Sequence, residues 1–408
     1  MYFGSRWNVL ITRPEYVAQV IRNNNIFEKS GNSEKIPHAV VSEFLGDNVI
    51  SAGNARWRQY RDVVTNSILF PNTASLDARV DELVSVCAAQ SKKGTVRVND
   101  VLQRFFLASI GDCVLGCDLD SSTDTFSILD RIRYLKTQIF RPVYMAFPIL
   151  DKLPIPSRVH AKAQVKEFKA LIRSKILQER CPENADRLGS QLATAHENGD
   201  LTQKQFEDNA IIALVAGHEN PEMLLATVLY LLSKYPEVQH KLRDQLKCLD
   251  PSQKESLPYL HAVIFECLRL YPPIGQLANR ITRQKVCLGR DILIPKGVYI
   301  GTNSFITQRD RAIWEDADKF LPQRWGTTEK EIMAKYNLAK SRCELTAFHG
   351  RNRACLGEKF ALMEVRKCVV AILENFEFSL DPAWKEQITP AGPIWPVQLS
   401  LAIKTLHD

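Results

Sequence analysis

The sequence of 408 residues lacks the features that mark several simple classes of protein. It has no cluster of consecutive lysines and arginines, although Lys+Arg 53 against Asp+Glu 46 leaves a net charge of +7, so a nucleic-acid partner is not expected. The longest apolar stretches, such as 211–217 and 224–232, are far shorter than the roughly 20 residues of a membrane-spanning helix. No signal peptide, repeat or low-complexity segment is evident. With 45% hydrophobic and 24% charged residues, the composition predicts a globular protein with a large core.

The ten cysteines do not indicate a disulfide framework or a zinc site. They are spread along the chain without a secretion signal, which favours reduced thiols. Cys113 and Cys117 lie four residues apart in an apolar stretch and have no second pair of ligands at metal-binding spacing. We interpret both as small buried residues of the core.

The pattern of apolar residues predicts a mainly α protein with small β-sheets. Residues 7–12 read as a strand, Pro14 opens a helix, and residues 56–270 are mainly helical. After 272–273 the sequence changes to short alternating runs that predict strands. The further expected elements are strands at 286–288, 292–294 and 298–300, a helix at 357–376 and a strand-rich tail at 394–403.

The segment 203–235 predicts a long helix in the interior, because its apolar residues surround it on all sides. Polar residues interrupt it at Gly217-His218-Glu219-Asn220-Pro221. Pro221 has no N–H to donate to the carbonyl of Gly217, so we expect a kink and a polar notch there. Buried polar groups need partners, and a polar core network around a helix bend would also explain them.

A second chemical signal is Cys355, which follows a loop rich in glycine and arginine and directly precedes a predicted helix. The positive end of a helix lowers the pKa of a thiol there and favours a thiolate that binds metal. Gly350 and Gly357 leave room for a flat cofactor, and Arg353 is able to pair with a carboxylate. Taken alone, such a cysteine is more often structural.

The spacing of Phe348, Arg353, Cys355 and Gly357 resembles the haem-binding pattern F-x-x-G-x-R-x-C-x-G of the cytochrome P-450 family. One position departs, because Arg351 stands where the pattern has glycine and Gly350 comes one residue early. The pattern therefore does not define the local turn, but the cysteine and the preceding arginine stay in register. The resemblance implies that Cys355 is the axial thiolate ligand of haem b.

Further motifs resemble the family at two places. Glu266 and Arg269, three residues apart on one helix, resemble its E-x-x-R, although such a pair alone is usually a solvated surface pair. The segment Phe320-Leu321-Pro322-Gln323-Arg324-Trp325 resembles F-x-P-E-R-F/W, with glutamine in place of glutamate. The implied triad of Glu266, Arg269 and Arg324 is a structural network that holds the cysteine loop.

The resemblance also assigns cofactor contacts and an oxygen-binding groove. Trp57 and Arg61 resemble W-x-x-x-R, and with Arg280 and Arg353 they are implied to bind the two haem propionates. Without the family, Trp57 and Arg61 read as an amphipathic helix start. In the groove, Gly217 and Glu219 resemble A/G-G-x-D/E-T, whereas Asn220 replaces threonine. Catalytic contributions are expected from these residues: Gly217, Glu219 and Asn220.

As a whole, the resemblance implies a cytochrome P-450 fold with a long kinked helix over the haem and a cysteine loop beneath it. Residues 1–408 are expected to form one catalytic domain that lacks the membrane anchor, hinge and first helix of the family. The full-length protein is expected on the cytosolic face of the endoplasmic reticulum membrane, and the given chain is expected to be soluble. An NADPH-dependent reductase is the implied partner. The candidates for a basic patch that binds it are Arg351, Lys359, Arg366 and Lys367. A plain solvated helix face is the alternative interpretation of these residues.

The implied activity is oxidation of a small aromatic or hydrophobic substrate with O₂ and NADPH-derived electrons. Residues 215–239 and 355–364 resemble fungal members that couple tyrosine-derived phenols in spore-wall formation or secondary metabolism, which favours oxidative coupling. A hydroxylase of a hydrophobic metabolite is the alternative. A reductase-independent haem isomerase or dehydratase, and a haem-binding protein without activity, also remain open.

Overall fold

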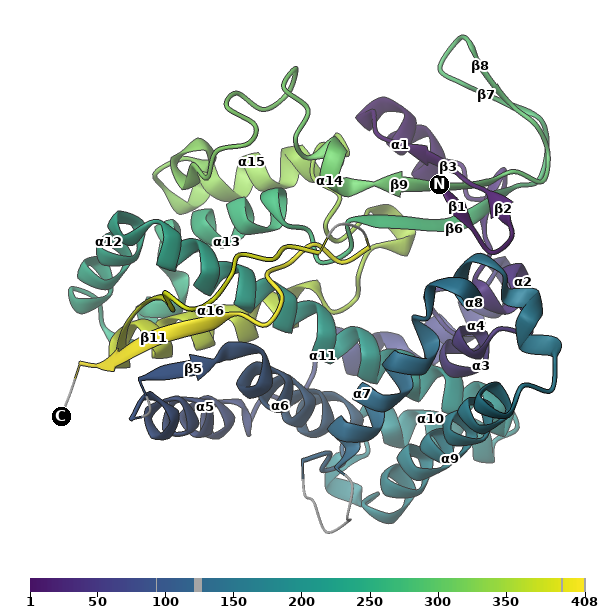
Figure 1. Ribbon diagram of the computed structural model, residues 1–408, viewed down its shortest axis with the longest axis horizontal. Helices are drawn as coiled ribbons and strands as arrows, with labels where there is room; N and C mark the ends of the chain where they lie inside the picture. The colour runs from purple at the N-terminus through teal and green to yellow at the C-terminus, as the bar shows by residue number, and fades with distance from the viewer. Residues whose placement is uncertain (93, 121–126, 390–391, 407–408) are drawn as a thin grey trace.

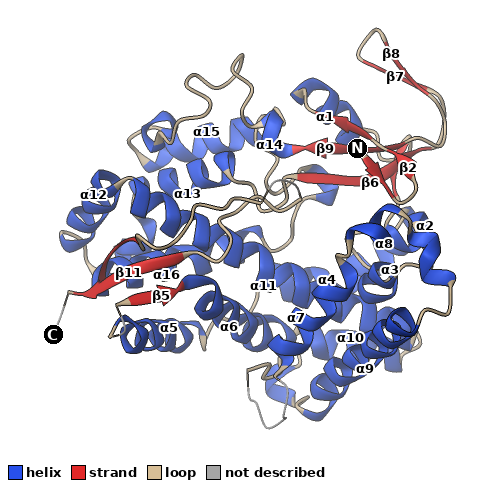
Figure 2. Ribbon diagram, in the orientation of Figure 1, coloured by secondary structure: helices blue, strands red, loops and turns tan. Residues whose placement is uncertain are grey.

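Helices make up most of the molecule. The computed structural model describes residues 1–408 except 93, 121–126, 390–391 and 407–408. It is 58% helical with small sheets, which confirms the expected fold class. Figure 2 shows the strands gathered at separate places around a body of helices. Among the described residues, no helix has both the length and the apolarity that crossing a bilayer requires.

The first half of the chain is helical apart from short strands (Figure 1). Pro14 opens a helix, as predicted. The elements in order are β1 Tyr2–Phe3, β2 Arg6–Trp7, β3 Val9–Ile11, α1 Pro14–Arg22, β4 Phe27–Lys29, α2 Asn32–Lys35, α3 Val40–Leu45, α4 Asn54–Leu69, α5 Leu76–Ser91, β5 Thr95–Arg97, α6 Val98–Ile110, η1 Gly111–Leu115, α7 Ile128–Ile139, α8 Pro142–Ala146, η2 Pro148–Lys152, α9 Pro156–Gln178, η3 Pro182–Asn184 and α10 Leu188–Glu197.

The second half begins with the long helix α11 and ends in a small sheet (Figure 1). Its elements are α11 Gln203–Lys234, α12 Pro236–Lys247, η4 Pro251–Ser256, α13 Pro258–Leu270, β6 Gln276–Thr282, β7 Val286–Leu288, β8 Ile292–Ile294, β9 Tyr299–Asn303, α14 Ser304–Thr307, η5 Pro322–Trp325, α15 Glu329–Ser341, η6 Arg351–Arg353, α16 Glu358–Asn375, β10 Phe376–Leu380 and β11 Ser400–Thr405. The predicted helices 203–235 and 357–376 therefore agree with α11 and α16 to within one residue at each end.

The largest sheet brings together segments that are far apart in the sequence. Its strand order is β3-β9-β6-β4, with β3 parallel to β9 and the other pairs antiparallel. This register sets Lys29 of β4 opposite Arg280 of β6. A second sheet has the order β10-β11-β5, and β7 pairs with β8 as a hairpin.

The strand predicted at 7–12 is divided at Asn8 into β2 and β3, and the later predicted strands agree with the structure except at the tail. The hairpin strands have the predicted bounds, and the strand predicted at 298–300 is β9. The prediction of strand over 394–403 is wrong in its first part, because β11 begins only at Ser400. Before it lies an isolated bridge between Ile388 and Pro396. Pro393 and Pro396 lack the N–H that a continuous ladder needs.

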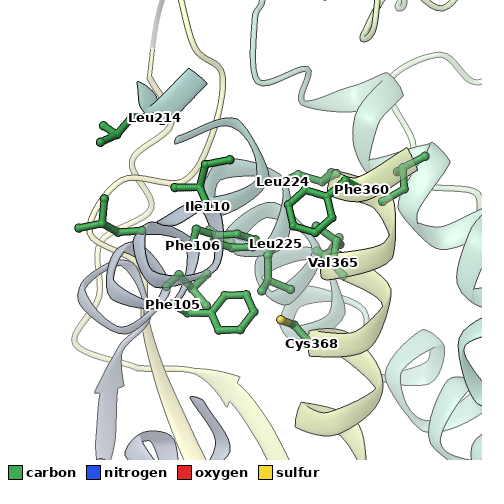
Figure 3. Close-up of a cluster of buried hydrophobic side chains, with 14 of the residues drawn as sticks. Phe105, Phe106, Ile110, Leu214, Leu224, Leu225, Phe360, Val365 and Cys368 are labelled. Carbon is green, nitrogen blue, oxygen red and sulfur yellow. The ribbon is translucent and has the colours of Figure 1, made fainter. Parts of the chain in front are cut away.

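Helix α11 runs through the main hydrophobic core, as its all-round apolarity predicts (Figure 3). Leu214, Leu224 and Leu225 of α11 belong to the same buried cluster as Phe106 of α6 and Val365 of α16. The helix begins with a capping box, in which the Thr202 hydroxyl accepts from the Gln205 N–H and the Gln205 carboxamide accepts from the Thr202 N–H.

Pro221 lies inside α11, and the helix continues beyond it to Lys234. Proline has no N–H, so the carbonyl of Gly217 loses its helical donor. A β-carbon added at Gly217 would lie 2.2 Å from Cδ1 of Ile110 on α6. Gly217 thus lets α6 approach α11 closely, which is a packing role that the sequence pattern did not indicate.

Candidate functional site

The cysteine loop lies where the sequence places it, directly before α16. The N–H of Cys355 donates to the carbonyl of Phe348 at 3.0 Å, and the Ala354 N–H donates to Arg351 at 2.9 Å. Gly357 is the N-cap of α16. These bonds fold residues 348–355 into a compact turn that presents Cys355 at the start of the helix.

The backbone of this turn explains the departure from the family pattern. Arg351 has φ +60°, the left-handed conformation that glycine adopts without strain. Gly350 has φ −155° and ψ 167°, an extended conformation open to any residue. The turn therefore keeps its left-handed residue at position 351, although that residue is an arginine.

The two glycines leave space beside this loop. A β-carbon at Gly350 would meet no atom within 4 Å. One at Gly357 would make only ordinary contacts, at 3.9 Å from Ile68 and 4.0 Å from Sγ of Cys355. The packing of the described residues does not require glycine at either place.

The expected lowering of the Cys355 pKa is wrong for the protein by itself. Its side chain is accessible to solvent but also densely surrounded by protein, and this desolvation raises the pKa of the thiol to about 11. The N–H groups of Gly357 and Glu358 lower it, but by less. The helix start is therefore too weak to ionise the thiol, whereas a metal cation displaces the proton when it binds.

Trp57 of α4 brings two of the expected arginines together. The Arg353 guanidinium lies 4.1 Å from the centre of the Trp57 ring, and that of Arg61 lies 5.6 Å from it. Arg61 also donates to the carbonyl of Asn352 at 3.2 Å. Cation–π contacts hold both guanidinium groups without neutralising their charge.

Arg280 joins this group from the sheet. It donates from Nη1 to Oδ1 of Asn24 at 2.8 Å and to the carbonyl of Phe27 at 2.7 Å. Burial lowers the pKa of Arg280 to about 10. The pKa of Arg353 is also lowered to about 10, first by burial and then by the positive charges of Arg280 and Arg61.

Sequence reasoning missed a fourth cation, Lys29. It is 7% exposed and lies opposite Arg280, which is 6% exposed. Burial, Arg280 and Arg353 together hold the pKa of Lys29 well below its usual value. Burial and the positive charges of Lys29 and Arg280 lower the pKa of His349 to about 3. No motif marks Lys29, and only the antiparallel pairing of β4 with β6 reveals it.

We call Lys29, Arg61, Arg280 and Arg353 the cation cluster. One of its atoms, Nη1 of Arg353, is buried and finds no hydrogen-bond partner in the described residues. The carboxylate that acts on Arg353 is Glu28, which is already ion-paired with Arg283. Buried like charges are unfavourable unless an anion joins them. The cluster therefore fits a group with two carboxylates, as the expected haem has.

The triad of Glu266, Arg269 and Arg324 is assembled in the structure. Glu266 accepts two bonds from Arg269 at 2.8 and 2.9 Å and one from Arg324 at 2.9 Å. The Trp325 indole donates to the same carboxylate at 3.0 Å. Glu266 and Arg269 are both 0% exposed, so the alternative interpretation of this pair as a solvated surface pair is wrong. We call these four residues the Glu266 network.

Gln308, which no motif indicated, connects this network to the cysteine loop. Arg269 donates to the Gln308 carbonyl at 2.9 Å. The Gln308 carboxamide oxygen accepts from the Thr346 N–H at 2.9 Å, and the Thr346 carbonyl accepts from the His349 N–H at 3.0 Å. The Glu266 network therefore reaches the loop through one buried glutamine.

The polar residues of α11 find partners on the helix and on α7. Asn220 Nδ2 donates to the Ala216 carbonyl at 3.1 Å, and His218 Nδ1 lies 2.7 Å from the Leu214 carbonyl. Burial lowers the pKa of His218. Oε1 of Glu219 pairs with Nζ of Lys136 at 3.0 Å. His218 thus fits the alternative of a local polar network, while Glu219 is tied to a second helix.

The basic patch is smaller than expected. Lys367 pairs with Asp77 at 2.6 Å and with Glu255 at 2.8 Å, so its charge is neutralised. Arg366 has a buried Nε without a partner. Arg351 and Lys359 remain exposed.

All ten cysteines are free thiols, and Cys113 and Cys117 are buried as predicted.

Comparisons with known proteins agree with this geometry. The family model for cytochrome P450 matches residues 1–405. Cytochrome P450-DIT2 of Saccharomyces cerevisiae is 42% identical over 98% of this chain and 84% of its own length. Cytochrome P450 monooxygenase xanG of Aspergillus fumigatus is 31% identical over 96% of this chain and 77% of its own length. The probable cytochrome P450 4s3 of Drosophila melanogaster is 25% identical over 93% of this chain. A match over almost the whole chain, together with a cysteine turn beside a cluster of buried cations, shows that this chain belongs to the cytochrome P450 family.

Proposed function

We propose that Cys355 would bind the iron of a haem whose carboxylates the cation cluster would hold. The family uses haem and takes electrons from NADPH through a reductase. When bound, the haem supplies the reductive activation of O₂. The observation that carries the proposal is a set of four cations, at least two of them deeply buried, beside a cysteine at a helix start.

The residues of the chain have separate tasks in this proposal. Lys29, Arg280 and Arg353 bind carboxylate, and Arg61 adds positive charge beside Trp57. The Glu266 network keeps the cysteine loop in place through Gln308. None of these groups exchanges a proton with substrate, so they position and hold the cofactor.

In the groove, Glu219 and Asn220 handle protons and water. Asn220 uses one N–H on the Ala216 carbonyl, which leaves its carboxamide oxygen and second N–H for a water or a substrate group. Glu219 is the acid to which we assign the transfer of protons beside the groove. Lys136 fixes its carboxylate at 3.0 Å.

For the substrate, we propose a tyrosine-derived phenol that undergoes oxidative coupling. The support is the likeness of 215–239 and 355–364 to fungal phenol-coupling members and the 42% identity to Cytochrome P450-DIT2. Hydroxylation of a hydrophobic metabolite is the second candidate, favoured by the monooxygenase xanG at 31% identity.

The proposed location is the endoplasmic reticulum membrane. Exposed apolar side chains gather where β1 and β2 meet the segment α8–η2, including Trp7 (77% exposed), Phe140, Phe147 and Ile149. The two parts are joined by backbone bonds from Gly4 to Met145 and from Ser5 to Ala146. Apolar side chains with nearby exposed cations such as Lys152 suit a membrane surface. Replacing Trp7 and Phe147 by serine is expected to weaken sedimentation with anionic phospholipid vesicles.

The test combines a spectrum with turnover. The reduced protein with carbon monoxide should show the long-wavelength absorbance of a thiolate-bound haem, and Cys355→Ser should abolish it. Cys181→Ser removes another exposed thiol and serves as the matched control. With NADPH and reductase, N-formyltyrosine should shift the ferric Soret band and give a dimer. A spectrum unchanged by Cys355→Ser would contradict the ligand assignment, and hydroxylated product without dimer would favour the second candidate.

A further inference from the structure

Glu222 is a buried acid that the proposed mechanism does not use. It lies one residue beyond Pro221 on α11 and is 1% exposed. Its Oε1 atom has no hydrogen-bond partner among the residues that the structure describes. An isolated carboxylate at such a place would be costly, so the carboxyl group has to be neutral or find a cation.

The groups that face Glu222 come from three helices. From α11 itself come Glu219, three residues earlier on the same face, and His218, four residues earlier. From α7 comes the positive charge of Lys136, which acts on both Glu222 and His218. From α6 come the neutral carboxamides of Asn99 and Gln103. Within the described part of the chain, Lys136 is the one cation among the groups that act on Glu222.

Lys136 is paired with Glu219, and this leaves Glu222 without a counter-charge. The pKa of Glu222 is raised to about 8, mainly by burial, while the charge of Lys136 opposes the rise and that of Glu219 adds to it. At neutral pH, Glu222 therefore keeps its proton, and Lys136 is paired with Glu219 instead. The two carboxyl groups together hold one proton, and the lysine ammonium supplies one positive charge.

We propose that Glu219 and Glu222 share this proton and that the Lys136 ammonium pairs with whichever of the two is ionised. In the state seen here, the ammonium neutralises Glu219 and the proton is on Glu222. In the other state, Lys136 swings to Glu222, whose O–H bond breaks, and an O–H bond forms on Glu219. No net charge is created, because one carboxylate remains paired with the lysine in both states.

The exchange gives Glu219 the proton that its proposed task needs, so this inference rests on the proposed function of the groove. Residues three apart on a helix have β-carbons about 5–6 Å apart, which a long lysine side chain spans. The proton on Glu222 is replaced from solvent on the side of α6 and α7. There the exposed Arg133 holds the Gln103 carboxamide oxygen at 2.8 Å. Glu222 thus acts through Glu219 and is a positioning residue.

Glu222→Gln is the main test, because it keeps the shape of the side chain and removes the exchangeable proton. With Lys136 then held on Glu219, the yield of product per NADPH at neutral pH should fall about tenfold. The yield should recover at acidic pH, where Glu219 takes a proton from solvent. Wild type should instead lose yield as the pH rises through about 8. Glu222→Asp keeps an acid and should retain the wild-type profile in part.

Glu364→Gln is the matched control. Glu364 on α16 is also 1% exposed, burial also raises its pKa to about 8, and Ser109 donates to it at 2.5 Å. It has no place in the groove, so its replacement should leave the pH profile of the yield unchanged. The same shift in both variants would show a general effect of buried acids and would overturn the proposal.

Infrared spectroscopy of the intact haem protein gives a reading that is independent of turnover. The C=O stretch of protonated carboxyl groups should be present at neutral pH and weaken above about pH 8. One component of this band should be absent in Glu222→Gln, and a different component should be absent in Glu364→Gln. Absence of the Glu222 component would overturn the proposal even if the variant folds poorly. If Glu219→Gln lowers the yield but Glu222→Gln does not, the shared proton is rejected and the groove assignment stands; if neither does, the groove assignment itself fails.

Discussion

The Glu266 network and the cation cluster both bury arginines, but they treat charge in opposite ways. In the network, Glu266 accepts from Arg269, Arg324 and Trp325, and the remaining donors of Arg269 reach backbone carbonyls. In the cluster, Lys29 lies opposite Arg280, and Arg353 has a buried Nη1 atom without a partner. One set is closed within the chain, whereas the carboxylate nearest the other, Glu28, is paired with Arg283 outside the cluster.

This difference separates a scaffold from a binding site. Buried charges whose partners all lie in the same chain stabilise the fold only while the set of partners is complete. Cations buried beside one another destabilise the fold until an anion binds among them. They therefore favour the binding of an anion. The same residue type, arginine, therefore serves both tasks, and its neighbours decide which one.

The largest expected effect is on the scaffold. Glu266→Gln leaves Arg269 and Arg324 buried without their counter-charge, which should lower the free energy of unfolding by about 3–5 kcal/mol. Urea unfolding followed by circular dichroism measures this. A loss below 1 kcal/mol would show that the network is not a closed unit.

The cluster should respond in the opposite sense. Lys29→Met removes a buried charge, so the haem-free protein should unfold at the same or a higher urea concentration, while haem dissociates about tenfold faster. Transfer of haem to apomyoglobin gives the rate. Lys29→Arg keeps the charge and is the control. Unchanged haem loss in Lys29→Met would remove Lys29 from the site.

The pH dependence of stability sharpens the comparison further. The pKa of Lys29 in the folded protein lies well below 10.5, so the unfolded chain binds more protons between the two values. Stability of the haem-free protein should therefore rise with pH across that window and be lowest where Lys29 is charged in both states. Unfolding curves of wild type and Lys29→Met should converge as the pH approaches 10.5. Parallel curves would contradict the assignment.

The smallest effect concerns Arg351, an exposed arginine of the same loop outside the cluster. Arg351→Gly relieves φ +60° and should raise the free energy of unfolding by about 0.5–1 kcal/mol, since left-handed strain exceeds the entropy cost of glycine. Haem loss should not change. Gly350→Ala, at an extended position, should be neutral for the turn. Faster haem loss in Arg351→Gly would show that the cluster extends to this residue.

Local patterns predicted much of this fold and part of the site. The bounds of α11, α16 and the β7–β8 hairpin follow from periodicity and from turn residues. The spacing of Phe348, Arg353 and Cys355 survives the shifted glycine because Arg351 adopts the left-handed backbone itself. The tail was predicted less well, since alternating apolar residues do not reveal which N–H groups the prolines remove.

The sequence by itself determined where Cys355, the helices and the charged motifs stand along the chain, because these depend on neighbours a few residues away. Only the tertiary structure decided that Lys29 lies opposite Arg280, that Lys136 pairs with Glu219, and that burial raises the pKa of Cys355 and Glu222. Desolvation and ion pairing depend on which elements pack together, and β4 with β6, or α7 with α11, meet across long stretches of sequence.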